Sequence, residues 1–227
     1  MKRLSVFLAL VAAAGASAVL TQGWGRNLSG DISTGDYLYD VAFDASGHVW
    51  VAGSTTTNSN DHGDATLFRY SPTGTRLFRY ALPDWSDGLD IAFRAFPHAS
   101  GCVMVASQRN SGQTSGRVVI ESVSNNGLKQ WSDAVTLGQY DYLVDAVALE
   151  DAYVAVISRR NTFGFDYTQV VGWSKAGARA WTNSFARSPF EHAVPSAVAA
   201  NANRVAIGMY LEGTTDLPAV AVFGDDG

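Results

Sequence analysis

Three aspartates recur along the chain in a similar local sequence and could together do chemistry. Each lies just ahead of small apolar residues, in Asp40-Val-Ala, Asp90-Ile-Ala and Asp145-Ala-Val. Carboxylates gathered in one pocket could act as acid and base on a glycosidic bond, or could bind a cation or a basic peptide. A structural role is the other interpretation, because a carboxylate that accepts backbone N–H bonds orders its own segment. We expect the structural role.

Aromatic side chains in predicted loops form a second candidate site. Trp85 falls in the polar connection between residues 82 and 87. Tyr140 and Tyr142 occupy the corresponding connection later in the chain, and Tyr37 lies near it in the first part. Aromatic rings on loops stack on sugars or anchor contacts with proteins. The sequence therefore predicts a ligand-binding surface built from these loops.

The densest group of possible metal ligands lies in a polar segment rich in asparagine and aspartate. Its side-chain oxygens belong to Asn58, Asn60, Asp61 and Asp64. Hard cations such as Ca²⁺ prefer such oxygens, so calcium is the candidate cofactor. However, His62 stands where a calcium loop would need another oxygen, and no glutamate follows at the closing position. A solvated loop without a cofactor is therefore the preferred interpretation.

The other reactive side chains show no catalytic motif. The four histidines lack the spacing of metal ligands, and no Gly-x-Ser-x-Gly segment accompanies them. Cys102 is the single cysteine and lies in an apolar run, so we expect a small buried hydrophobic side chain. We therefore assign no catalytic residue from the sequence.

These residues are set in a sequence unit that repeats about every fifty residues. Each unit contains a turn that ends in glycine, and the four glycines are Gly74, Gly127, Gly177 and Gly227. They are spaced by 53, 50 and 50 residues. An aromatic residue follows the first three glycines by four positions, and these aromatics are Phe78, Trp131 and Trp181. A unit this short cannot bury a core by itself, so the units must pack on one another.

Each unit predicts short β-strands joined by tight turns. In the first unit, Asp44 and Gly47 mark the turn between the first two strands. Strands are expected at 37–43, 49–52, 65–70 and 76–80; at 89–93, 103–106, 117–123 and 128–131; at 143–148, 153–157, 167–173 and 178–181; and at 193–199, 204–208 and 217–223. The last unit is one strand short.

The missing strand is predicted near the beginning of the chain. Residues 19–24, which end in Trp24, resemble the strands that contain Trp131 and Trp181. Pairing this strand with the last unit would close a ring and remove an exposed sheet edge. We predict an all-β β-propeller of four four-stranded blades, closed by this N-terminal strand. A two-sheet sandwich, a ring shared by a homodimer and a fragment of a larger propeller are the alternatives.

The first residues are typical of an export signal. A basic start at Lys2 and Arg3 precedes an apolar run from Leu4 to Ala14 and a small-residue cleavage site at residues 16–18. We expect a signal peptide over 1–18, a propeller domain over 19–227, and residence outside the cytoplasm, secreted or in the periplasm or at the cell surface. Cleavage takes the formal charge from −5 to −7 and leaves no apolar run of spanning length. The predicted mature chain therefore neither binds nucleic acid nor inserts into a membrane.

The units resemble the repeats of secreted bacterial β-propellers. Residues 44–53 read Asp-Ala-Ser-Gly-His-Val-Trp-Val-Ala-Gly and fit the pattern Asp-x-x-Gly-x-Val-Tyr/Trp-Val-x-Gly of those repeats. Residues 63–68 fit the following Gly-Asp-x-Asp-x-Phe pattern, except that Thr66 replaces the second acidic residue. The blades of quinone-dependent dehydrogenases are also similar, but the adjacent cysteine pair typical of that family is missing here. The resemblance implies the fold and export, and it implies no particular activity.

We therefore expect a non-catalytic interaction module of the bacterial envelope or surface. Its partner would be an envelope protein or a surface polysaccharide, bound through the loops. The alternative is a propeller-type carbohydrate-active enzyme, a glycosidase or a lyase, that uses Asp40, Asp90 and Asp145 in the central pocket. Two carboxylates facing one pocket would favour the enzyme, whereas aspartates engaged in hydrogen bonds would favour the binding module.

Overall fold

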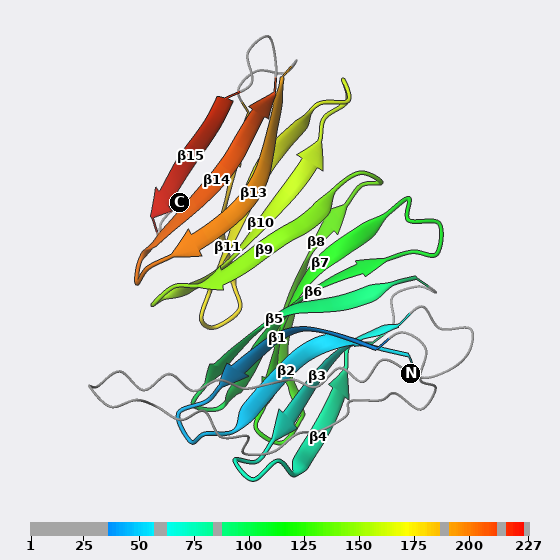
Figure 1. Cartoon of the computed structure of the whole chain (residues 1–227), viewed down its shortest axis with the longest axis vertical. Coiled ribbons are helices and arrows are strands. Elements are labelled where there is room, and N and C mark those ends of the chain that lie inside the picture. The colour runs from blue at the N-terminus through cyan, green and yellow to red at the C-terminus, as the bar shows by residue number, and fades with distance from the viewer. Residues whose placement is uncertain (1–35, 57–62, 84–87, 187–190, 213–216, 225–227) are drawn as a thin grey trace, which may run out of the picture.

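The computed structural model describes residues 36–56, 63–83, 88–186, 191–212 and 217–224, which form antiparallel β-sheets (Figure 1). Within these ranges, no helix is long and apolar enough to cross a membrane. The predicted signal peptide, the predicted closing strand at 19–24, Trp85 and most of the predicted calcium loop lie outside the described residues.

Four sheets follow one another along the chain, and each pairs its strands in sequence order. The first has β1 (Tyr37–Phe43), β2 (Val49–Thr55), β3 (Asp64–Tyr70) and β4 (Arg76–Ala81). The second has β5 (Asp90–His98), β6 (Gly101–Arg109), β7 (Gly116–Ser124) and β8 (Lys129–Leu137). The third has β9 (Tyr142–Ala148), β10 (Ala152–Arg160), β11 (Asp166–Ser174) and β12 (Arg179–Phe185). The fourth has β13 (His192–Ala200), β14 (Arg204–Glu212) and β15 (Leu217–Gly224).

Every strand predicted within the described residues is confirmed, including the three-stranded last unit. Several strands run further than their apolar residues indicate; β8, for example, continues from its aromatic Trp131 to Leu137. Polar residues such as Ser132 and Asp133 continue the ladder because their backbone groups pair with β7. Four antiparallel sheets in a repeated all-β chain are therefore established.

The sheets stack in a row, as Figure 1 shows, with the first sheet at one end and the fourth at the other. The first strand of each sheet packs against the sheet before it: β5 contacts β1, β2 and β3, and β13 contacts β9, β10 and β11. The strands described here do not form a closed ring. The predicted closure by residues 19–24 falls outside them and stays a prediction.

Apolar side chains fill each space between neighbouring sheets. Trp50, Leu67 and Met104 are buried between the first and second sheets. Ile120 and Trp173 are buried between the second and third. Cys102 is fully buried, and this burial raises the pKa of its thiol, so the prediction of a small core side chain is confirmed.

Each repeated glycine turn joins two strands of its own sheet and also packs against the neighbouring sheet. Gly127 and Gly177 have φ values of 78° and 89°, a conformation that residues with a Cβ rarely adopt. A Cβ on Gly127 would lie 3.1 Å from Cγ of Phe78, and one on Gly177 would lie 2.3 Å from Cδ2 of Trp131. The aromatic residue of one sheet therefore packs directly on the glycine turn of the next sheet.

Candidate functional site

The first strand of each sheet carries a β-bulge at the same place. The register shifts between Leu38 and Asp40 in β1, between Ala92 and Arg94 in β5, and between Pro195 and Ala197 in β13. In β9 the shift skips Val144 and precedes Asp145. The residues that follow the four bulges are therefore structurally equivalent, and they are Asp40, Arg94, Asp145 and Ala197.

Arg94 joins two of the equivalent positions by a bidentate ion pair. Its Nε lies 2.7 Å from Oδ1 of Asp145, and its Nη2 lies 2.9 Å from Oδ2. The hydrogen bond with Asp145 raises the pKa of Arg94 against the opposing effect of burial. Asp40 accepts the N–H of Ala95 at 2.9 Å and the N–H of Val41 at 2.9 Å. Both carboxylates therefore hold strands together, which is the structural role expected for them.

Asp90 does not belong to this row, and the structure corrects its grouping with Asp40 and Asp145. It lies at the start of β5, is buried, and accepts hydrogen bonds from Nε2 of Gln108 and the N–H of Arg109. The sequence Asp-Ile-Ala begins at Asp90, four residues before the position that follows the bulge in β5. Arg94 occupies that position.

The structural equivalents of Asp90 are two aspartates that the sequence analysis did not single out. Asp36 accepts the N–H of Thr56 at 3.0 Å, and Asp141 accepts the N–H of Arg160 at 2.9 Å. Each of these carboxylates fixes the end of the second strand in its own sheet, as Asp90 does. Each lies four residues before an aspartate that the sequence analysis did single out, Asp40 or Asp145, and this spacing is the signal that could have identified them.

Exposed aromatic rings lie near the starts of β1 and β9. Tyr37, Tyr140 and Tyr142 are exposed, and Phe163 is exposed in the loop between β10 and β11. Tyr142 pairs with Ser158 near the end of β10, so this loop lies at the same end of the third sheet. Three of the four aromatics predicted to bind a ligand are thus accessible in the described structure.

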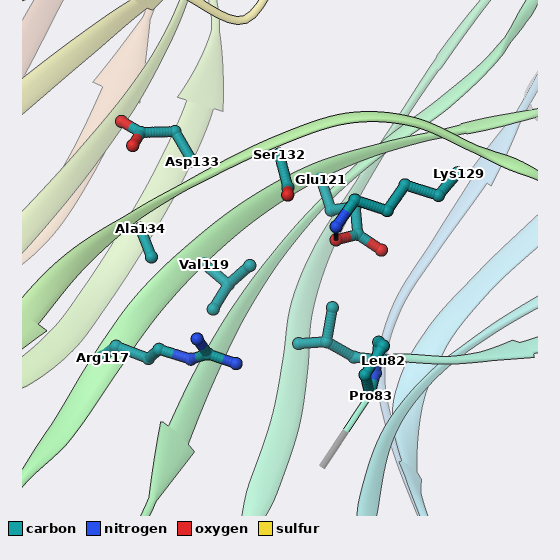
Figure 2. A pocket seen from close by; sticks show the side chains of 9 residues that line it. All are labelled: Leu82, Pro83, Arg117, Val119, Glu121, Lys129, Ser132, Asp133 and Ala134. Carbon is teal, nitrogen blue, oxygen red and sulfur yellow. Dashed lines mark ion pairs between the residues drawn. The ribbon is translucent and has the colours of Figure 1, made fainter. Parts of the chain in front are cut away.

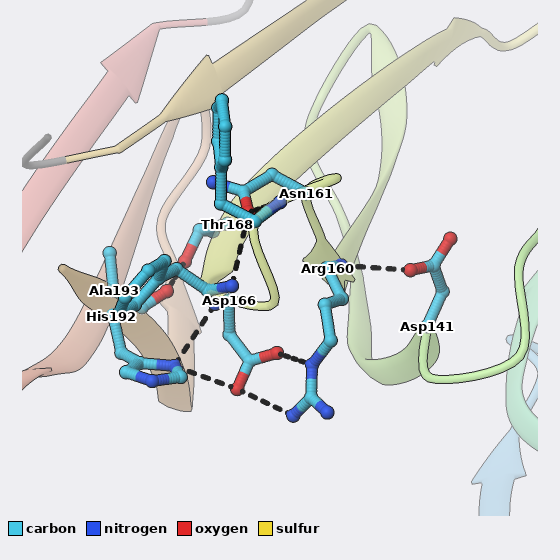
Figure 3. Close-up of polar contacts among 9 residues, drawn as sticks. Asp141, Arg160, Asn161, Asp166, Thr168, His192 and Ala193 are labelled. Carbon is cyan, nitrogen blue, oxygen red and sulfur yellow. Dashed lines mark hydrogen bonds and ion pairs between the residues drawn. The ribbon is translucent and has the colours of Figure 1, made fainter. Parts of the chain in front are cut away.

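A polar network holds Arg160, the cation next to one of these rings, and Figure 3 shows this network. The guanidinium of Arg160 lies 4.6 Å from the ring centroid of Tyr140. Nε of Arg160 pairs with Oδ1 of Asp166 at 2.8 Å, and Oδ2 of Asp166 lies 3.1 Å from Nδ1 of His192. His192 belongs to the fourth sheet, so the network joins the third sheet to the fourth and fixes the cation over the ring.

A cavity of about 420 Å³ opens between the end of β4 and the strands β7 and β8 (Figure 2). Its lining residues are Leu82, Pro83, Arg117, Val119, Glu121, Lys129, Ser132, Asp133 and Ala134. No residue of this cavity was predicted as a site. The signal in the sequence is Glu121, a charged residue within the otherwise apolar run of β7.

Charged groups dominate the cavity. Glu121 is only 2% exposed, accepts a hydrogen bond from the hydroxyl of Tyr80, and lies 3.2 Å from Nζ of Lys129. Burial, together with this carboxylate, raises the pKa of Tyr80. Nε of Arg117 donates to Oε1 of Gln108 at 2.7 Å, and burial lowers the pKa of Arg117.

Asp133 lines the same cavity but faces away from it, as Figure 2 shows. Its Oδ2 accepts hydrogen bonds from Nε1 of Trp173 at 2.7 Å and from Nε of Arg179 at 2.8 Å. Burial opposes ionisation of Asp133, but these bonds outweigh it and lower the pKa of the carboxyl. The carboxylate of Asp133 is therefore engaged with residues of the third sheet.

The described residues contain no group of three or more His, Cys, Asp or Glu side chains that could hold a metal ion. Of the predicted calcium ligands, only Asp64 is described, and its carboxylate lies 3.8 Å from Nη2 of Arg79. Asn58, Asn60 and Asp61 lie outside the described ranges, as does Trp85. The preferred interpretation, a solvated loop without a cofactor, and the alternative of a calcium site therefore both stay predictions.

Comparison with known proteins adds no family assignment. No protein-family model matches the chain, and no curated protein matches it. The similarity to secreted bacterial β-propellers therefore rests on the blade motifs, and function has to be argued from the residues of the two candidate surfaces.

Proposed function

We propose that this chain is an exported, non-catalytic β-propeller module that binds a polysaccharide of the bacterial envelope or surface. The four sheets would be its blades, and residues 19–24 would supply the fourth strand of the last blade. The repeated stacking of each first strand on the preceding sheet supports the propeller. Among the described residues the last sheet has three strands, so β15 offers an edge on which a fourth strand could pair.

The pair formed by Tyr140 and Arg160 carries the proposal. Tyr140 is 55% exposed, and Arg160 lies over its ring while held by Asp166. An exposed ring offers an apolar surface for the C–H face of a sugar, and the guanidinium beside it offers donors to hydroxyl groups. Tyr142 and Phe163 extend the aromatic surface at the same end of the sheet.

The carbohydrate-active enzyme is the less supported alternative. Asp40 and Asp145 accept backbone hydrogen bonds, and Asp145 is also paired with Arg94. Asp90 is buried against Gln108 and Arg109. A glycosidase needs one carboxyl group that donates a proton and a second that attacks or activates water. The three candidate aspartates are engaged in structural contacts instead.

A retention experiment tests this proposal. The mature chain, residues 19–227, would be immobilised and exposed to separated polysaccharide and protein fractions of an envelope extract. We expect saturable retention of polysaccharide. Tyr140→Ala should weaken it about tenfold, because stacking on an anchor residue contributes more than about 1 kcal/mol.

The matched control is Leu128→Ala, which truncates an exposed apolar side chain in the turn between β7 and β8, away from the aromatic surface. Its retention should equal that of the unchanged chain. Retention of a protein component alone, or polysaccharide retention that Tyr140→Ala leaves intact, would contradict the proposal.

A further inference from the structure

We infer that His192 makes polysaccharide binding at Tyr140 depend on pH, because the neutral and the protonated ring of His192 engage Asp166 in different ways. This inference rests on the proposed polysaccharide binding and describes the regulation of that site. His192 begins β13, and its ring lies beside Asp166, the first residue of β11, as Figure 3 shows. Binding should be weaker at pH 5.5 than at pH 7.5.

One nitrogen of the His192 ring has two partners that it cannot bond at the same time. Nδ1 lies 3.0 Å from the backbone nitrogen of Asp166 and 3.1 Å from Oδ2 of the same residue. The backbone N–H can donate only to an Nδ1 without a proton, and the carboxylate can accept only from an Nδ1 with one. In the neutral ring the proton belongs on Nε2, because Nδ1 then satisfies the backbone N–H of Asp166. The second proton therefore turns Nδ1 from the N–H to the carboxylate.

Asp166 is also the residue that holds Arg160. Nε of Arg160 donates to Oδ1 of Asp166 at 2.8 Å, and Nη2 donates to Oδ2 at 3.3 Å. The protonated ring of His192 shares Oδ2 with the longer of these two bonds. A charged donor bonds a carboxylate more strongly than a neutral donor, and the imidazolium repels the guanidinium beside it. Protonation of His192 therefore loosens the hold of Asp166 on Arg160.

Arg160 transmits this change to the proposed sugar-binding ring. Its guanidinium lies 4.6 Å from the ring centroid of Tyr140, and the ion pair with Asp166 anchors it there. A group that is already held in its binding position loses less conformational freedom when a ligand binds. Loosening Arg160 therefore weakens the attachment of a polysaccharide at Tyr140.

The surroundings of His192 contain carboxylates that can balance the charge of an imidazolium. Histidine is the side chain that ordinarily changes its charge between about pH 5 and pH 8. Among the described residues, the titratable and charged groups at this end of β13 and of the strands packed against it are Glu191 beside His192, Asp166 and Tyr167 on β11, Arg159 and Arg160 on β10, Asp141 and Tyr142 at the start of β9, and Tyr210 and Glu212 on β14. Arg159 is paired with Asp141, so Arg160 is the cation that the protonated ring meets at Asp166.

Nuclear magnetic resonance of the isotope-labelled mature chain, residues 19–227, tests the exchange of partners without any ligand. At pH 7.5 we expect the proton of the neutral His192 ring on Nε2. On acidification to pH 5.5, the backbone N–H of Asp166 and the Nε–H of Arg160 should shift with the same midpoint as the ring. A neutral ring protonated on Nδ1, or an Arg160 signal that does not follow the ring, overturns the inference.

Retention of the polysaccharide fraction of the envelope extract at both pH values is the second measurement. Retention by the unchanged chain should weaken about three- to tenfold at pH 5.5, the factor expected for the loss of one hydrogen bond. His192→Asn keeps an acceptor for the N–H of Asp166 but takes up no proton, so its retention should not depend on pH. His98→Asn, at a histidine of the second sheet, is the matched control and should keep the pH dependence. Circular dichroism checks the fold of both variants.

The outcomes separate this inference from the proposed function. Retention by the unchanged chain that is equal at both pH values, or a pH dependence that His192→Asn keeps, overturns the inference and leaves the proposed function standing. If no polysaccharide is retained at either pH, the proposed function is wrong and the role of His192 in binding is wrong with it. The resonance titration needs only the unchanged chain, so it decides the exchange of partners even if His192→Asn prevents folding.

Discussion

Asp44 joins the first turn of the chain to the neighbouring strands. Its Oδ1 accepts the N–H groups of Ser46 and His48, each at 2.9 Å. Its Oδ2 accepts Nε1 of Trp50 at 3.3 Å and Nη2 of Arg69 at 3.1 Å. Burial opposes ionisation, but the hydrogen bonds outweigh it and lower the pKa of Asp44 from 3.8 to about 2. Since Arg69 also donates to a carbonyl in the turn between β7 and β8, this carboxylate helps to hold two sheets together.

The lowered pKa predicts how stability depends on pH. A carboxyl whose pKa is lower in the folded state stabilises the fold above about pH 4, and this contribution is lost between about pH 4 and pH 2. Asp44→Asn should therefore reduce the free energy of unfolding at pH 7 by about 1–2 kcal/mol, allowing for solvent screening. Urea denaturation at pH 7 and pH 2.5 measures this.

The difference between Asp44→Asn and the unchanged chain should be clearly smaller at pH 2.5 than at pH 7, because most of the contribution is lost by then. Asp151→Asn, at an exposed aspartate, is the control and should change stability little at either pH. A difference of equal size at both pH values would show that the charge of Asp44 contributes nothing.

At the residue level, the sequence predicts the structural role of Asp40 and Asp145 but not the ion pair of Asp145 with Arg94. Asp40 and Asp145 were expected to accept backbone N–H bonds, and they do. Arg94 could not be identified, because its equivalence to them depends on a bulge that only the register reveals. The cavity around Arg117 and Glu121 was missed for a similar reason, since it forms between two separate sheets.

The glycine turn and the aromatic residue of the preceding sheet form the element that repeats. Gly177→Ala should destabilise the fold by about 2–4 kcal/mol, because it combines a strained positive φ with a Cβ that overlaps the ring of Trp131. Gly164→Ala is the matched control, since Gly164 has a φ of 88° and no atom within 4 Å of its Cβ position. It should cost only about 1 kcal/mol.

The difference between these two variants in thermal or urea denaturation isolates the contact between sheets. Equal losses of stability would mean that the positive φ of the turn alone, and not its packing on Trp131, requires glycine at position 177. The unchanged chain and both variants should retain the same circular dichroism, because either change is confined to one turn.

The strands themselves were predictable because turns and apolar runs are local features. The turn residues Asp44 and Gly47, for example, separate β1 from β2 where expected. The β-bulges and the extra length of β8 were not, because they depend on pairing with a neighbouring strand. Sequence patterns therefore located the strands of each sheet. The pairing of these strands, and the side chains that meet between sheets, could be found only from the structure.

At the scale of the whole molecule, the described sheets at the two ends of the row expose apolar side chains. The second and third sheets bury both faces, since each has a neighbour on either side. On the outward face of the fourth sheet, Val220 is 71% exposed and Val222 is 60% exposed. On the first sheet, Val41 and Phe43 are exposed beside a small buried cluster on the same face. Exposed apolar faces of this kind are typical of surfaces that pack against something else.

Closure of the proposed ring would cover these faces, and Val222→Asp tests it. In a closed ring the outward face of the fourth sheet packs on the first sheet, so an unpaired buried carboxylate should cost about 2–4 kcal/mol in the free energy of unfolding. In an open row the same change lies at the surface and should alter stability by less than about 0.5 kcal/mol. Leu128→Asp, at a side chain that is 68% exposed, is the control and should stay within that smaller range.

We expect the larger loss for Val222→Asp, measured by urea denaturation of the mature chain. Light scattering then separates two forms of closure, because a ring within one chain has the mass of a monomer and a ring shared by two copies has twice that mass. In the shared ring, Val222→Asp should also convert the dimer to a monomer, since it places a charge in the contact between copies. A monomer whose stability Val222→Asp leaves unchanged would mean that the fourth sheet ends the molecule as an open edge, and that the ring is not formed.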